Sequence, residues 1–139
     1  VVFFNPLSIN KKWVLKTQVQ SQIRFGDEYE FFQAAQLGTN TGLRGYRRDR
    51  FTGKNALASS IDLRYGFNQF STKVVPLQMG VFGGFDFGRV WLNDVASNQW
   101  HNSYGGGFWL NMANLLSGQI NVFHSNDGFL FTFGFTTDF

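Results

Sequence analysis

The carboxyl-terminal sequence GFLFTFGFTTDF places a phenylalanine at almost every second position. Successive side chains of a β-strand point to opposite faces, so this segment has one aromatic face and one face of mostly small or polar residues. The aromatic face comprises Phe129, Phe131, Phe133 and Phe135. Strands of a transmembrane β-barrel alternate in this way, with apolar side chains toward lipid and polar side chains toward the lumen. We therefore expect these four phenylalanines to face lipid.

The composition agrees with a membrane barrel and excludes other classes. Aromatic residues make up 19% of the chain and charged residues 15%, against roughly 25% charged residues in soluble domains. No segment approaches the ~18 consecutive apolar residues that a transmembrane helix requires. The net charge of +3 is too small and too scattered to indicate nucleic-acid binding. Cysteine is absent, which fits an envelope protein that avoids stray disulfides.

The alternation predicts eight antiparallel strands in a single domain, residues 1–139. Their approximate ranges are 1–5, 12–25, 28–37, 56–67, 75–91, 103–112, 115–125 and 129–139. Long connections at 6–12, 38–55 and 92–102 alternate with shorter ones, as in outer-membrane barrels, and an even number of strands puts both termini in the periplasm. The predicted fold is all-β: an eight-stranded antiparallel transmembrane β-barrel, or the C-terminal eight strands of a larger barrel.

A soluble eight-stranded barrel of the lipocalin type is the alternative, since its strands also alternate. In such a barrel the apolar face points inward and the outer face is charged. In this chain the non-aromatic faces of the strands are rich in Gly, Ala, Ser, Gln and Thr, which suits a narrow lumen better than a solvated surface. The membrane barrel is therefore the favoured interpretation.

Two carboxylates fall on the predicted lumen face. The alternation places Asp62 and Asp86 inside, and a carboxylate in a confined lumen requires a cationic partner. Arg44 lies in the loop of residues 38–55, which is long enough to reach inward, and its guanidinium can bond carboxylates bidentately. The alternative is that the segment RGYRRDR is a solvated basic loop that faces anionic lipopolysaccharide.

The segments AAQLGTNTGLRGYRRDRFTGKNALASSIDLRYGF and GVFGGFDFGRVW resemble the C-terminal barrel half of the BamA/TamA surface-antigen superfamily, which includes the FhaC-type two-partner secretion transporters. The likeness covers about residues 34–139, and residues 1–33 share only general barrel character. It implies that a loop with an Arg-Gly-aromatic motif folds into the lumen, here Leu43, Arg44, Gly45 and Tyr46. It also implies that Asp62 and Asp86 line the inner wall of the next two strands.

The final strand is similar to the C-terminal targeting signal of the same superfamily. Thr132, Gly134, Thr137 and Phe139 occupy the positions of that signal, and Thr137 stands where an apolar residue is usual. The resemblance implies that assembly machinery of the outer membrane recognises this strand.

The length of the chain departs from the superfamily, whose members usually have sixteen strands and periplasmic domains that bind client proteins. A closed eight-stranded barrel has a lumen that side chains just fill, which leaves little room for an inserted loop. Three resolutions remain: the chain is one half of a larger barrel whose N-terminal half is missing, it is a short member with a Gly-rich lumen, or two copies join edge to edge. We favour a complete short barrel that forms a homodimer.

No catalytic or metal-binding arrangement is predicted, so we expect neither an enzyme nor a cofactor. His101 lies in a polar loop, where we expect it to be exposed, and His124 ends a strand; neither has the spacing of a metal site. The run Gly105-Gly106-Gly107 lacks the Lys-Ser/Thr pair and the helix of a phosphate-binding loop. On a strand it indicates a bend or close packing.

The resemblance implies a role in outer-membrane biogenesis or secretion, in which a weak lateral seam of the barrel assembles or translocates a substrate. The alternative is a non-catalytic barrel that anchors a fused or partner enzyme at the bacterial outer membrane. A passive channel ranks last, because a lumen of eight strands is too narrow for a porin. The expected partners are outer-membrane lipids, lipopolysaccharide and the assembly machinery.

Overall fold

The computed structural model describes residues 1–7, 12–23, 34–67, 70–71, 76–91, 99–112 and 116–136. Within these ranges the chain is all-β, with a single 3₁₀ turn, η2 (Thr39–Thr41), and no α-helix. The strands are β1 (Val2–Pro6), β2 (Trp13–Ile23), β3 (Ala35–Leu37), β4 (Phe51–Gly53), β5 (Asn55–Gly66), β6 (Phe70–Ser71), β7 (Pro76–Trp91), β8 (His101–Met112), β9 (Leu116–Ser125) and β10 (Gly128–Thr136). None of the described residues belongs to a helix long and apolar enough to cross a membrane.

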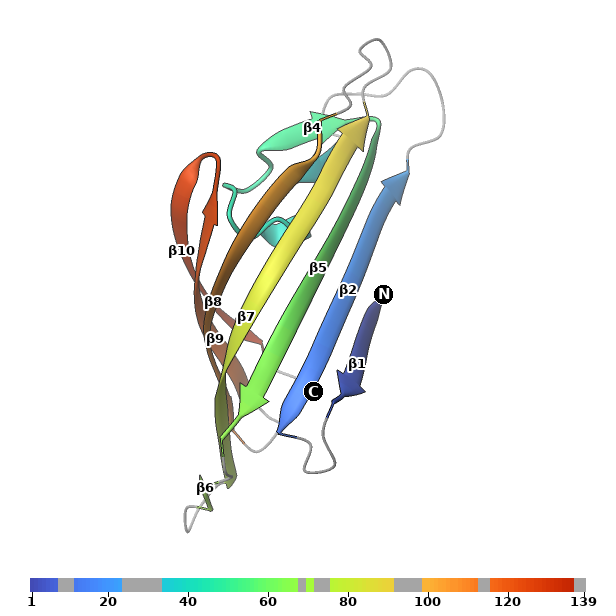
Figure 1. Cartoon of the computed structure of the whole chain (residues 1–139). Helices are drawn as coiled ribbons and strands as arrows, with labels where there is room; N and C mark the ends of the chain where they lie inside the picture. Colours follow the sequence, from blue (N-terminus) through green and yellow to red (C-terminus); the bar gives the residue numbers. More distant parts are fainter. Residues whose placement is uncertain are drawn as a thin grey trace.

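Most of the strands form one antiparallel sheet, in the order β1-β2-β5-β7-β8-β9-β10, and the short β6 pairs with one end of β7. Figure 1 shows these strands side by side in a tilted, curved sheet, with the β3–β4 pair lying against one side of it near the upper end. The sheet is therefore a meander, interrupted between β2 and β5 by β3 and β4, which form a separate two-stranded sheet.

Small and polar side chains gather on one face of this sheet, which we call the inner face. Lys16 pairs with Asp62, and Asp86 pairs with both Ser60 and Ser103. Directly paired residues of an antiparallel sheet share a face, so all of these side chains lie on the inner face. The opposite, outer face carries apolar side chains that include Val19, Ile61, Leu63, Phe85, Phe108, Ile120 and the four phenylalanines of β10, all exposed.

The hydrophobic core lies between the sheet and the segment of residues 34–54, which we call the insertion. Strand β3 contacts β2, β5 and β7, and β4 contacts β7. The buried apolar cluster comprises Ala35, Leu37, Leu43 and Tyr46 of the insertion together with Ala56, Ala58 and Val90 of the sheet. Removal of these side chains from water holds the insertion against the inner face.

The predicted strand at 28–37 is not part of the main sheet. Strand β2 pairs directly with β5, from Trp13 opposite Tyr65 to Ile23 opposite Asn55, so no strand lies between them. Of the predicted range, Ala35–Leu37 forms β3 and pairs with β4 in a separate two-stranded sheet, and residues 28–33 lie outside the described residues. The period of two had indicated extended backbone correctly at β3, but it carries no information about the partner strand.

The predicted all-β antiparallel sheet is confirmed, and no closed barrel is detected among the described residues. In the described part of the chain, β1 and β10 each pair with one neighbour only and not with each other. With seven antiparallel strands along the path, β1 and β10 run in the same direction. Along this path the described residues form seven strands, one fewer than the eight predicted.

Cysteines placed at positions 17 and 61 together should form a disulfide on oxidation. Thr17 and Ile61 are direct partners in β2 and β5, and opposed residues of antiparallel strands have Cα atoms about 4.5–5.5 Å apart, within the ~4.4–6.8 Å that a disulfide spans. The chain has no cysteine of its own, so mass spectrometry of the digested protein reads the cross-link directly. Thr17→Cys with Ser60→Cys is the control, because these side chains lie on opposite faces. Equal cross-linking of both pairs would contradict the register.

Candidate functional site

Arg44 lies where the insertion meets the sheet, and it bonds both predicted carboxylates. Its Nη2 donates to Asp62 Oδ1 at 2.5 Å and to Asp86 Oδ1 at 2.6 Å. Its Nε donates to both carboxylate oxygens of Asp86 at 3.1 Å, and its backbone N–H donates to Asp86 Oδ2 at 2.9 Å. One residue of the insertion thereby links β5 to β7.

These three charges are withdrawn from water. The side chains of Asp62 and Asp86 are 3% and 0% exposed, and that of Arg44 is 14% exposed. Burial lowers the pKa of Arg44, but its hydrogen bonds with Asp86 and Asp62 and the charges of these carboxylates outweigh that effect, so its pKa lies above the ordinary value. Arg44 therefore stays charged. We call Arg44 together with Asp62 and Asp86 the Arg44 brace.

Gly84 and Phe123 shape the space around the guanidinium. A Cβ atom on Gly84 would lie 2.5 Å from Asp62 Oδ1 and 2.7 Å from Arg44 Nη2, so a larger residue would displace the ion pair. The buried ring of Phe123 has its centroid 4.2 Å from Arg44 Cζ, a cation–π contact. A Cβ atom on Gly105 would lie 2.8 Å from the Phe123 ring, so this glycine leaves room for the aromatic support.

Gly45 binds the insertion to β8 and β9 through its backbone. Its N–H donates to Ser103 Oγ at 3.2 Å, and its carbonyl oxygen accepts from Ser125 Oγ at 2.7 Å. Ser103 Oγ also donates to Asp86 Oδ2 at 3.1 Å. A Cβ atom on Gly45 would lie 2.5 Å from Ser103 Cβ, so this close approach of the backbone requires glycine. Arg44 and Gly45 together bind side chains of β5, β7, β8 and β9.

Leu43 and Tyr46 complete the predicted motif, and both are buried in the core. Tyr46 Oη donates to the backbone carbonyl of Asn102 at 3.2 Å. The Tyr46 ring packs edge-on against Phe51 and His101, with ring centroids 5.1 and 5.9 Å away. All four residues of the motif therefore belong to the contact between the insertion and the sheet.

The other arginines of this segment are placed differently. Arg47, Arg48 and Arg50 are exposed, and Arg50 Nε lies 2.7 Å from Asp127 Oδ2 in a surface ion pair. The alternative of a solvated basic loop therefore describes these three residues and is wrong for Arg44.

The expected exposure of His101 is wrong. His101 begins β8, is partly buried and stacks on Phe51 with 3.7 Å between ring centroids. Strand β8 begins two residues before the predicted boundary, and the polar residues before His101 gave no sign of this packing. His124 lies in β9 and packs against Tyr104 and Phe129. No group of three potential metal-ligating side chains occurs among the described residues.

The predicted targeting signal is described only in part. Thr132 Oγ1 donates to Asn121 Oδ1 at 2.5 Å, and Gly134 pairs with Gln119 on the inner face of β10. Thr137 and Phe139 lie outside the described residues. The phenylalanines at 129, 131, 133 and 135, predicted to face lipid, are between 72% and 77% exposed on the outer face.

Three contacts of the site escaped sequence reasoning: Ser103, Ser125 and Phe123. The alternation places all three on the inner face, but it does not show how deep along each strand the insertion reaches. Phe123 did carry a signal, because it is an aromatic residue within the otherwise polar inner row of β9. An aromatic residue in a polar row indicates that another segment packs over that residue, here the insertion with Arg44.

Comparison of the chain with protein-family models, with curated proteins and with solved structures finds no match. The resemblance to the surface-antigen superfamily therefore stays an expectation, based on the residues quoted for it.

Replacing Arg44 with alanine should lower the free energy of unfolding by about 3–5 kcal/mol, because two buried carboxylates then lose their cation. Arg44→Lys should recover only part of this loss, since an ammonium lacks the planar fork that reaches both carboxylates. Denaturant unfolding of the folded chain measures both effects. Arg48→Ala is the matched control, an exposed arginine of the same segment, and should change stability by no more than about 0.5 kcal/mol. Equal losses from Arg44→Ala and Arg48→Ala would refute the brace.

Proposed function

We propose that this chain forms part of an outer-membrane β-barrel that acts in outer-membrane biogenesis or secretion. The observation that carries the proposal is the separation of side chains between the two faces of one sheet. The outer face exposes Phe108 (65%) and Ile120 (64%) beside the phenylalanines of β10, whereas the inner face holds ions, amides and glycines. Contiguous exposed apolar surface of this kind marks an interaction site, and the alternation is the one that lipid on the outer face requires.

The two sheet edges support a barrel that further strands complete. Within the described residues, β1 and β10 are hydrogen-bonded on one side only, and an open edge does not occur against lipid because its backbone groups lack partners. The inner face also holds the insertion, whereas the interior of an eight-stranded barrel is already filled by side chains. The closing strands therefore come from a second copy or from an N-terminal barrel half. Membrane lipids and lipopolysaccharide surround the outer face.

The contacts of the insertion favour a lateral seam at these edges. Arg44 and Gly45 bind side chains of β5, β7, β8 and β9, so the middle of the sheet is braced. Strands β1 and β10 are held by pairing with a single neighbour. An edge outside the brace opens more readily than the braced strands, and a substrate strand can add to it through backbone hydrogen bonds. Arg44 then has a positioning role, keeping the wall rigid beside the seam.

A polarity-sensitive fluorophore on Phe131→Cys should shift its emission to the blue when the chain is folded into lipid vesicles. The reason is that Phe131 projects from the outer face, 76% exposed. The same label on Thr132→Cys is the control, because Thr132 bonds Asn121 on the inner face. Each protein carries a single label, since the chain has no cysteine. Equal emission from the two positions would contradict a lipid-facing outer surface.

Loss of this protein from its native cells should lower the amounts of several other outer-membrane proteins, measured by quantitative mass spectrometry of the outer-membrane fraction. Re-expression with Arg48→Ala should restore these amounts, and re-expression with Arg44→Ala should restore them poorly. An anchor barrel predicts a different result: unchanged outer-membrane proteins and displacement of one partner enzyme.

A further inference from the structure

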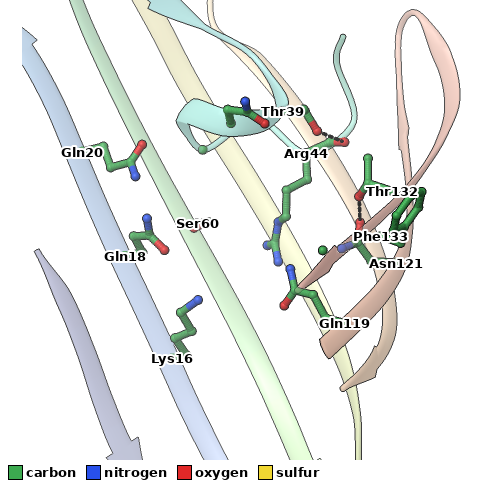
Figure 2. A pocket seen from close by; sticks show the side chains of 13 residues that line it. Lys16, Gln18, Gln20, Thr39, Arg44, Ser60, Gln119, Asn121, Thr132 and Phe133 are labelled. Atoms are coloured by element: carbon green, nitrogen blue, oxygen red, sulfur yellow. Dashed lines mark hydrogen bonds between the residues drawn. The ribbon is translucent and has the colours of Figure 1, made fainter. Parts of the chain in front are cut away.

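A second polar site lies on the inner face, toward the end of the sheet away from the insertion. It is a cavity of about 350 Å³ lined by Lys16, Arg64, Trp109, Asn111, Gln119 and neighbouring residues of β8, β9 and β10. Figure 2 shows the adjoining pocket that Arg44 lines; Lys16 of β2 and Gln119 of β9, on opposite sides of it, also line this cavity. Leu43, Arg44, Gly45 and Tyr46 do not line this cavity, and of the predicted targeting signal only Gly134 does among the described residues.

Two N–H donors at the cavity are buried without a partner. The Nε of Arg64 and the Nε1 of Trp109 are shielded from solvent and make no hydrogen bond within the described part of the chain. Arg64 Nη2 lies 3.9 Å from Asp62 Oδ2, beyond hydrogen-bond distance. Leaving a buried donor unpaired is unfavourable, so these two N–H groups point to an acceptor that enters the cavity.

The charge around the cavity is also unbalanced. On the inner face of the described strands and in the Arg44 brace, the charged side chains are the cations Lys16, Arg44 and Arg64 and the carboxylates Asp62 and Asp86. Arg44 uses Asp62 Oδ1 and both oxygens of Asp86. Among these described groups, Lys16 and Arg64, which line the cavity, therefore share what remains of Asp62, and one positive charge is in excess.

The donors are held in place by the sheet itself. A Cβ atom on Gly80 would lie 2.8 Å from Trp109 Cε2. Glycine at this position therefore leaves room for the indole ring to pack against the strand. Arg64 Cζ lies 5.6 Å from the centroid of the Phe82 ring, which supports the guanidinium from the neighbouring strand. The site therefore exists before any ligand binds, and binding does not require the donors to be ordered first.

We propose that this cavity binds a phosphate group. Lys16, Arg64 and Trp109 present an ammonium, a guanidinium edge and an indole N–H from three strands, β2, β5 and β8. A phosphate offers three or more acceptor oxygens and a negative charge, which matches three donors and an excess positive charge. The volume exceeds that of a single phosphate, so the group is either a hydrated free ion or the headgroup of a larger molecule such as a lipid.

The indole N–H resonance of Trp109 tests the proposal directly. The full chain is folded in nonionic detergent micelles, and the resonance is identified by its loss in Trp109→Phe. Titration with inorganic phosphate should shift this resonance in a saturable way and leave the other tryptophan indoles in place. Micelles doped with phosphatidylglycerol form the second arm. A shift with inorganic phosphate assigns the site to the phosphate group itself, and a shift only with the lipid assigns it to a headgroup.

Variants measured by calorimetry separate binding from misfolding. Trp109→Phe should weaken binding about fivefold, the effect of one neutral hydrogen bond, and Arg64→Gln or Lys16→Gln roughly tenfold or more. Arg50→Gln, which removes an exposed arginine paired with Asp127 outside this cavity, should leave the affinity unchanged. No shift of the Trp109 resonance in either arm, or equal affinity in Lys16→Gln and the unmodified chain, would overturn the proposal and leave water as the occupant.

Discussion

The ion pair of Arg44 with Asp62 and Asp86 is the constraint on which the arrangement of this chain depends. Three charges are buried together, and each is tolerable there only while the others are in place. The contact of the insertion with β5 and β7 is therefore stable only when all three charges are in place. Gly45, Gly84 and Gly105 follow from the same requirement, because the backbone, the guanidinium and the supporting Phe123 ring need space that a side chain would fill.

The inner face consequently has two parts with different electrostatics. Around Arg44 two carboxylates share one guanidinium, the polar groups are hydrogen-bonded and the strands are bound to the insertion. Toward the other end, Lys16 and Arg64 face a cavity with one charge in excess and two unpaired donors. The first part is suited to hold the wall rigid, and the second is suited to receive an anion. The unpaired edges of β1 and β10 lie outside the braced strands, where the proposed seam would open.

Most strands from Asn55 onward could be predicted from the alternation, and so could the inward direction of Asp62 and Asp86. Strands β1 and β2 could be predicted as well, but the insertion could not, because Ala35–Leu37 has the same extended pattern as a sheet strand and pairs instead with Phe51–Gly53. His101 was misplaced for a related reason: a polar loop composition does not show that Phe51 of the insertion stacks on its ring. In both cases the deciding contact is with the insertion.

By itself the sequence determined which residues share a face, since a period of two is a local property of extended backbone. It also determined the chemistry of the brace, because two inward carboxylates need a cation and only one long loop carries an arginine beside a glycine. Only the tertiary structure decided that β2 pairs with β5, that β1 and β10 have no second partner strand within the described residues, and that Lys16, Arg64 and Trp109 line one cavity. Backbone hydrogen bonds between strands are nearly the same for every sequence, so partner and register depend on contacts between distant segments that no local pattern records.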